Sequence, residues 1–220
     1  MWTSWTRRPP PDVPTAAARF PETTRLETFS DGVFAIAITL LVLEIPVPTE
    51  ADVAAARGLW PALGSHWSSF LGYAISFVTI GIMWANHHSI FQYVRRTDRR
   101  FLLVNVLFLM GIAFLPFPTA VLAAHLPDAS SRVAATMFYG TTLVAIAILF
   151  NAVWWAGTWK GRLLGSDIDR DGVRVITERY RLGPISYLVA LGVAPLSVWL
   201  SLGIHLALAL FFSRGERPGA

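Results

Sequence analysis

The sequence predicts an all-α polytopic membrane protein with six transmembrane helices. Hydrophobic residues make up 54% of its 220 positions and charged residues only 15%, whereas soluble domains carry about 25% charged residues. Uncharged stretches long enough to cross the roughly 30 Å hydrocarbon core recur along the chain. Basic residues gather in the short segments between these stretches, as is typical of membrane proteins.

Four crossings follow from apolar length alone, at residues 25–46, 67–94, 101–126 and 133–159. The last apolar run, residues 182–212, has 31 residues and exceeds one ordinary crossing. Proline disfavours a helical conformation in the residue before it, so we expect a turn at Ala194-Pro195 between helices 178–194 and 195–213. The predicted number of transmembrane helices is then six.

The basic residues predict the orientation. Of the 18 Lys and Arg residues, 16 lie in the N-terminal tail, residues 95–100, residues 160–181 and the C-terminal tail, and only Arg57 and Arg132 lie on the opposite side. The positive-inside rule then places both termini in the cytoplasm. The net charge of +4 reflects this orientation and gives no support for nucleic-acid binding.

We therefore expect a disordered cytoplasmic tail at residues 1–21, a membrane domain at residues 22–214 and a short cytoplasmic tail at residues 215–220. Tryptophan is enriched at membrane interfaces. Five tryptophans fit such interfacial belts, namely Trp60, Trp67, Trp154, Trp155 and Trp159.

The first apolar helix has two distinct faces. At 100° per residue, Gly32, Thr39, Leu40 and Leu43 lie within about 60° of Ile36, and Asp31 lies about 140° from it. The stripe around Ile36 is suited to line a pore, although ordinary helix packing uses the same residue types. No internal repeat is evident, so a pore would require several copies of the chain.

Asp31 begins one crossing at the predicted cytoplasmic boundary. Asn86, His87 and His88 end the next crossing, and Asn105 begins the third, all near the same level. Polar groups at one depth can satisfy each other's hydrogen bonds inside a bundle. We therefore expect a structural network between helices, while a proton or cation relay through Asp31 is the alternative.

These residues resemble the transmembrane protein 175 family, the endosomal and lysosomal potassium channels and their prokaryotic relatives. The resemblance is carried by Arg25, Phe29-Ser30-Asp31, Ala35, Ile36, Thr39-Leu40-Leu41 and Pro46, and by Trp84-x-Asn86-His87-His88. It implies a moderately potassium-selective cation channel in a prokaryotic plasma membrane. Its partners would be the lipid bilayer, permeating potassium and other monovalent cations, and further copies of the chain in a homotetramer whose four first helices line the pore.

The resemblance also implies roles for individual residues. The hydrophobic constriction would be formed by Ile36, Leu40 and Leu43, and potassium selectivity would depend on Thr39. The structural hydrogen-bond network would comprise Arg25, Ser30, Asp31, His88 and Asn105. The TVGYG filter of ordinary potassium channels is absent from the sequence, so stacked backbone carbonyls of that kind cannot provide selectivity.

Two other functional classes remain open: a proton-coupled secondary transporter or proton leak pathway, and a non-transporting scaffold. Transporters commonly show internal repeats and broken helices around a midplane site. An enzyme is not expected, because cysteine is absent and no nucleophile has placed partners. We expect no cofactor, and the scattered histidines form no repeated metal-ligand pattern.

One cytoplasmic segment matches the calcium loop of an EF-hand. Asp167, Asp169, Asp171, Gly172 and Glu178 fit the spacing D-x-D-x-D-G-x5-E. Arg170 and Arg174 dilute the negative charge. The alternative is a solvated turn in which Asp171 caps the following helix.

Overall fold

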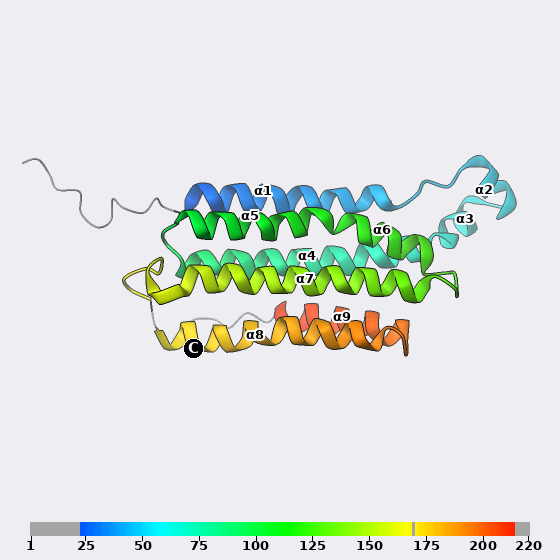
Figure 1. Ribbon diagram of the computed structural model, residues 1–220. Helices are drawn as coiled ribbons and strands as arrows, with labels where there is room; N and C mark the ends of the chain where they lie inside the picture. The colour runs from blue at the N-terminus through cyan, green and yellow to red at the C-terminus, as the bar shows by residue number, and fades with distance from the viewer. Residues whose placement is uncertain (1–22, 169, 214–220) are drawn as a thin grey trace, which may run out of the picture.

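The computed structural model describes residues 23–168 and 170–213, and these residues form a bundle of helices (Figure 1). Within them, strand-like pairing is limited to isolated bridge residues, which include the antiparallel bridge between Val94 and Leu164. The all-α prediction is therefore confirmed for this part of the chain. The predicted tails at residues 1–21 and 215–220 lie outside the described residues.

Four helical segments among the described residues are long and apolar enough to cross a membrane. The first is α1 (Thr24–Leu40) with its 3-10 extension η2 (Leu41–Glu44), and the second is α4 (Trp67–Tyr93). The third joins α5 (Arg99–Phe114) to α6 (Pro116–His125), and the fourth joins α7 (Arg132–Thr158) to the 3-10 turn η3 (Trp159–Gly161). These segments correspond to the four crossings that apolar length predicts.

The third crossing is broken where the sequence predicts one helix. Pro116 has no backbone N–H, and its ring clashes with the preceding turn, so the helix is interrupted at Leu115. Both residues are buried, and Thr119 resumes the helical bonding to the Leu115 carbonyl at 3.2 Å. The break bends the crossing without ending it.

The last apolar run forms two helices, α8 (Arg170–Val193) and α9 (Val198–Ser213), joined by a turn that contains Pro195. They lie side by side in Figure 1. The Ser201 hydroxyl of α9 donates to the Ala190 carbonyl of α8 at 2.7 Å. The first half of α8 is charged, and α8 is not among the four segments that are long and apolar enough to cross a membrane. Helix α9 is apolar but shorter than those segments.

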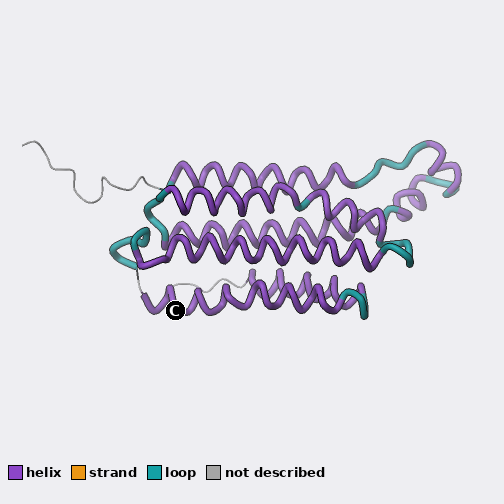
Figure 2. Tube along the Cα trace, viewed as in Figure 1, coloured by secondary structure: helices purple, strands orange, loops and turns teal. Residues whose placement is uncertain are grey.

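The short helices α2 (Glu50–Ala55) and α3 (Leu59–Ser65) project beyond one end of the bundle. Thr49 and Asp52 form a capping box at the start of α2. Figure 2 shows that the loops gather at the two ends of the long helices. Apart from the turn at Leu115, the middle of the described bundle is therefore helical, as a hydrocarbon environment requires.

Trp154 corrects the interfacial prediction. It is only 2% exposed, and its indole nitrogen donates to the Thr177 hydroxyl of α8 at 2.9 Å. Its neighbour Trp155 is 47% exposed. Trp154 therefore holds α7 to α8 inside the bundle and is not an interfacial anchor.

The acidic spacing at residues 167–178 does not form a calcium loop. An EF-hand loop needs a sharp turn at its sixth residue, but Gly172 lies inside helix α8. Asp171 and Glu178 are therefore about 10 Å apart along one helix axis, and Glu178 pairs with Arg174 at 3.4 Å. Asp169 lies outside the described residues, among which no group of three or more His, Asp or Glu side chains could hold a metal.

Candidate functional site

Helix α1 is the least covered membrane-length helix of the described chain. In its most apolar stretch 28% of residues are buried, against 44% in each of the other three segments. Its buried side chains recur every three or four residues, which places them on one face. They are Leu26, Ser30, Phe34, Ala37 and Leu41.

The predicted pore stripe lies on the uncovered face. Ile36 is 61% exposed, Leu40 40% and Leu43 74%, and Thr39 is exposed beside them. This face is a continuous apolar stripe that contains one hydroxyl group, that of Thr39. Such a surface requires lipid or another protein surface against it.

Thr39 presents its hydroxyl in a defined way. The hydroxyl donates to the Ile36 carbonyl one turn earlier, at 2.9 Å. Its proton is thus engaged by its own helix, and the oxygen lone pairs remain available on the exposed face. An oxygen with available lone pairs suits a cation or a water molecule that hydrates one.

The buried face is fastened by a directional chain of hydrogen bonds. Ser30 donates to the Leu26 carbonyl at 2.8 Å, and the Asn105 amide nitrogen of α5 donates to the Ser30 oxygen at 3.0 Å. The Asn105 oxygen is then free to accept from His87 Nε2 of α4, which lies 2.7 Å away. Three helices, α1, α4 and α5, are joined by this chain.

His87 also sits among aromatic rings. Its ring stacks on Phe108 at 5.3 Å between centroids, and Phe34 and Phe91 lie 5.4 and 5.1 Å away. Its Nδ1 atom has no hydrogen-bond partner within the described chain. Because Nε2 donates to Asn105 and Nδ1 faces apolar surroundings, the imidazole is held as the neutral tautomer protonated on Nε2.

Two further contacts join α1 to α4 on its acidic side. The Trp84 indole nitrogen donates to Asp31 at 2.9 Å, and His88 pairs with Glu27 at 3.0 Å. Glu27 and Asp31 are four residues apart, as are Trp84 and His88, so each helix presents one pair on one face.

The membership of the network therefore differs from the sequence expectation. Ser30 and Asn105 are bonded to each other, but Asp31 and His88 have separate partners. Arg25 is exposed and about 20° from Ile36 around the helix, and the described residues give it no partner in the network. Sequence reasoning missed Glu27, Trp84 and the central role of His87, although the matched four-residue spacing is a usable signal for the first two.

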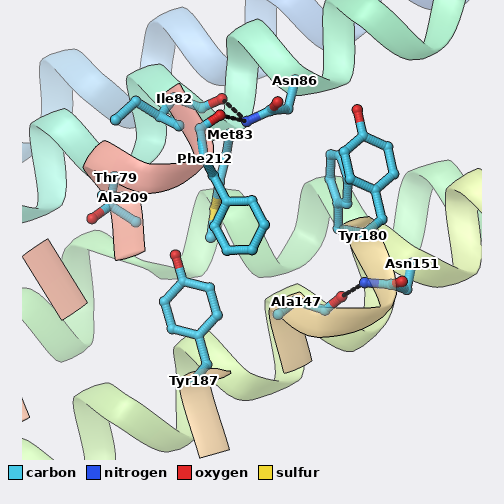
Figure 3. Close-up of a pocket in the computed structure, with 12 residues that line it drawn as sticks. Thr79, Ile82, Met83, Asn86, Ala147, Asn151, Tyr180, Tyr187, Ala209 and Phe212 are labelled. Carbon is cyan, nitrogen blue, oxygen red and sulfur yellow. Dashed lines mark hydrogen bonds between the residues drawn. The ribbon is translucent and has the colours of Figure 1, made fainter. Parts of the chain in front are cut away.

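A separate small cavity of about 50 Å³ lies among α4, α7, α8 and α9 (Figure 3). Asn86 donates across it to the Phe212 carbonyl at 3.2 Å, while Asn151 donates to the Ala147 carbonyl of its own helix at 3.0 Å. Tyr187 points into the cavity from α8 (Figure 3). In the described part of the chain, Asn86 thus donates to its own helix and to α9, and none of its hydrogen bonds reaches α1.

Comparison with known proteins adds three findings. The family model for "Endosomal/lysosomal potassium channel TMEM175" matches residues 25–116. A potassium channel of Chamaesiphon minutus is 50% identical over 192 residues, covering 87% of this chain and 94% of that protein. A potassium channel of Streptomyces collinus is 46% identical over 198 residues, covering 90% and 94% of the two chains.

A solved structure is similar to this fold over most of the chain. The crystal structure of a lysosomal potassium-selective channel TMEM175 homolog from Chamaesiphon minutus superposes with a TM-score of 0.79 at 45% identity. The match covers 88% of this chain and 98% of that one. The similarity therefore includes the helices that follow the family-model match.

Proposed function

Because this chain belongs to the TMEM175 family, we propose that it is a potassium channel of moderate selectivity in a prokaryotic plasma membrane. Four copies assemble around a central axis with their α1 helices lining the ion path. All six apolar helices cross the membrane, and both termini are cytoplasmic. The observation that carries this proposal is the uncovered stripe on α1.

The stripe supports a narrow apolar neck. Four α1 helices that turn Ile36, Leu40 and Leu43 toward one axis would form successive rings of branched aliphatic side chains. Such rings exclude water when narrow, and a small widening rehydrates them. The neck would therefore act as the gate of the permeation path.

Thr39 supplies the polar layer between these rings. Its hydroxyl proton is engaged by the Ile36 carbonyl, so four copies would present oxygen lone pairs toward the axis. These oxygens would replace part of an ion's hydration directly or through water. The proposal assigns potassium selectivity to this layer.

The buried face of α1 has a positioning role in this proposal. Ser30, Asn105 and His87 fix the rotation of α1 about its own axis, and the Asp31–Trp84 bond adds a second fixed point. Asp31 lies about 140° around α1 from Ile36, the centre of the stripe, which favours this role over a relay in the ion path.

The test is a bilayer recording of the reconstituted full chain with potassium on one side and sodium on the other. The parent should conduct without a pH gradient, and Thr39→Val should lower the potassium-to-sodium permeability ratio several-fold. Thr142→Val is the matched control, because within the described residues that buried hydroxyl bonds only the Phe138 carbonyl of its own helix. It should leave the ratio unchanged.

Two results would contradict the proposal. An unchanged ratio in Thr39→Val would remove the selectivity role of the threonine layer. A current that appears only with a pH gradient would indicate proton-coupled transport in place of a channel.

A further inference from the structure

Two tryptophans and two basic residues form a ladder on the surface where α5 begins and α7 ends. Figure 1 shows that these two helix termini lie at the same end of the bundle. The Trp155 and Trp159 ring centroids are 4.5 Å apart. The Arg100 guanidinium carbon lies 4.9 Å from the centre of the Trp155 ring, and the Lys160 ammonium lies 5.9 Å from that of Trp159. We call these four residues the tryptophan ladder.

The backbone after α7 turns Lys160 back toward Trp159. Lys160 has a φ of 55° and Gly161 a φ of 65°, so two successive residues adopt the left-handed region. This conformation is uncommon for a residue with a side chain. The segment that follows is fastened to the end of α4, because the Leu163 carbonyl accepts from the Arg95 backbone N–H at 3.0 Å.

The two cations of the ladder are available to an anion. Neither Arg100 nor Lys160 pairs with a carboxylate anywhere in residues 23–168 and 170–213. The nearby acid Asp98 is already engaged, since it accepts from the Phe101 backbone N–H at 2.8 Å and pairs with Arg162 at 3.3 Å. The first turn of α5 adds the positive end of a helix dipole to the same place.

We propose that the tryptophan ladder binds the headgroup of an anionic phospholipid in the leaflet that meets this end of the bundle. Trp155 and Trp159 are 47% and 38% exposed, and they lie at the end of a membrane-length helix. Exposed tryptophan at that depth packs among headgroups and upper acyl chains, while the flanking cations attract the phosphate.

The alternative occupants fit less well. A soluble anion would use Arg100 and Lys160 but has no use for two exposed apolar rings. The ladder also lies on α5 and α7, away from the stripe of α1. Lipid binding here is therefore separate from the permeation path, and a loss of conduction would not by itself test it.

The experiment measures lipid binding to the detergent-purified full chain by native mass spectrometry. Dioleoyl phosphatidylglycerol is compared with dioleoyl phosphatidylcholine, which has the same acyl chains and no net charge. A basic residue near an anionic surface contributes about a fivefold gain in affinity. The double variant Arg100→Gln with Lys160→Gln should therefore bind phosphatidylglycerol about 25-fold more weakly, with phosphatidylcholine binding unchanged.

A matched control removes two charges from the other end of the bundle. The double variant Arg57→Gln with Arg132→Gln has the same net charge as the test variant, and it should retain the parent's preference for phosphatidylglycerol. A third variant, Trp155→Leu, keeps both cations but removes the ring on which Arg100 rests. It should also weaken phosphatidylglycerol binding.

Three outcomes would overturn the proposal. Equal losses in the test and control variants would show that total charge alone attracts the lipid. Full affinity in Trp155→Leu would remove the role of the rings. Displacement of phosphatidylglycerol by inorganic phosphate at an equal concentration would assign the site to a free anion.

Discussion

Replacing Asn105 with leucine tests whether the hydrogen-bond chain on the buried face holds α1 in place. Asn105 and Ser30 are fully buried, and His87 is 1% exposed. Leucine has a similar volume but leaves the His87 Nε2 proton without its acceptor at 2.7 Å. Ser30 is less affected, because it still donates to the Leu26 carbonyl.

The expected cost follows from the one donor left unpaired. A buried donor without a partner costs roughly 1–3 kcal/mol, while hydrogen bonds between membrane helices average about 0.6 and reach about 1.7 kcal/mol. We expect Asn105→Leu to lower the free energy of unfolding by about 1–2 kcal/mol. A change of this size raises the equilibrium constant for unfolding about tenfold.

The double variant with His87→Phe separates a lost hydrogen bond from altered packing. Phenylalanine fits the aromatic surroundings of Phe34, Phe91 and Phe108, and it removes the donor that Asn105→Leu leaves unpaired. The double variant should therefore lose at least about 1 kcal/mol less than the sum of the two single losses. The measurement is reversible unfolding by SDS in mixed micelles, followed by fluorescence.

The control is Asn151→Leu on α7. Its amide donates only to the Ala147 carbonyl of its own helix in the described part of the chain, so no bond between helices is lost. It should destabilise less than Asn105→Leu. Additive losses in the Asn105 and His87 double variant would refute the reasoning, because the pair would then act through volume alone.

Two further predictions concern packing and a loop. Gly157→Ala should destabilise the fold by about 1–3 kcal/mol, because its new Cβ would lie 2.6 Å from a Val94 methyl carbon. Gly192→Ala in α8 meets nothing within 4 Å and should leave the unfolding temperature unchanged or raise it. Hydrogen bonds from the two serines that follow lower the pKa of Asp128. Asp128→Asn should therefore lower the unfolding temperature at neutral pH. This difference should begin to shrink as the pH falls below about 4, the ordinary pKa of an unfolded Asp, and it should be lost as the pH passes through the lower pKa of the folded protein; a difference that stays constant in acid would contradict the assignment.

The helices were predictable because their signals are local. Apolar length identifies the four membrane-length segments, and Pro195 marks the turn between α8 and α9. The break at Leu115 has a local cause as well, but Pro116 can also be accommodated within a continuous helix. Whether a proline bends or ends a helix depends on neighbouring helices.

The side-chain partners were less predictable, since they depend on how each helix is rotated and shifted. An argument from depth places residues only to within about one helical turn, or roughly 5.4 Å. That error is large enough to place Asp31 and His88 in one expected network, although they contact Trp84 and Glu27 respectively. The interfacial prediction for Trp154 was wrong for a related reason. A position near the membrane boundary does not determine whether a ring faces lipid or a neighbouring helix.

The acidic residues at 167–178 match the sequence pattern of a calcium loop, but the backbone there does not adopt the structure of that loop. A calcium loop needs the chain to turn at Gly172, whereas Arg174 and Glu178 favour a helix through their four-residue spacing. Once α8 begins at Arg170, Asp171 and Glu178 lie on the same helix about 10 Å apart along its axis. Local helix formation therefore prevents the arrangement that the spacing alone suggests.

The two faces of α1 use different interactions for a physical reason. In lipid, apolar side chains gain little by contacting each other instead of acyl chains, so apolar packing alone fixes the rotation of a membrane helix weakly. Directional bonds from Ser30, Asp31 and Glu27 supply that orientation on the covered sides. The face with Ile36, Thr39 and Leu43 is then free to vary without loosening the helix. Changes at Thr39 should accordingly alter permeation at constant stability, while changes at Asn105 should alter stability first and permeation only through the orientation of α1.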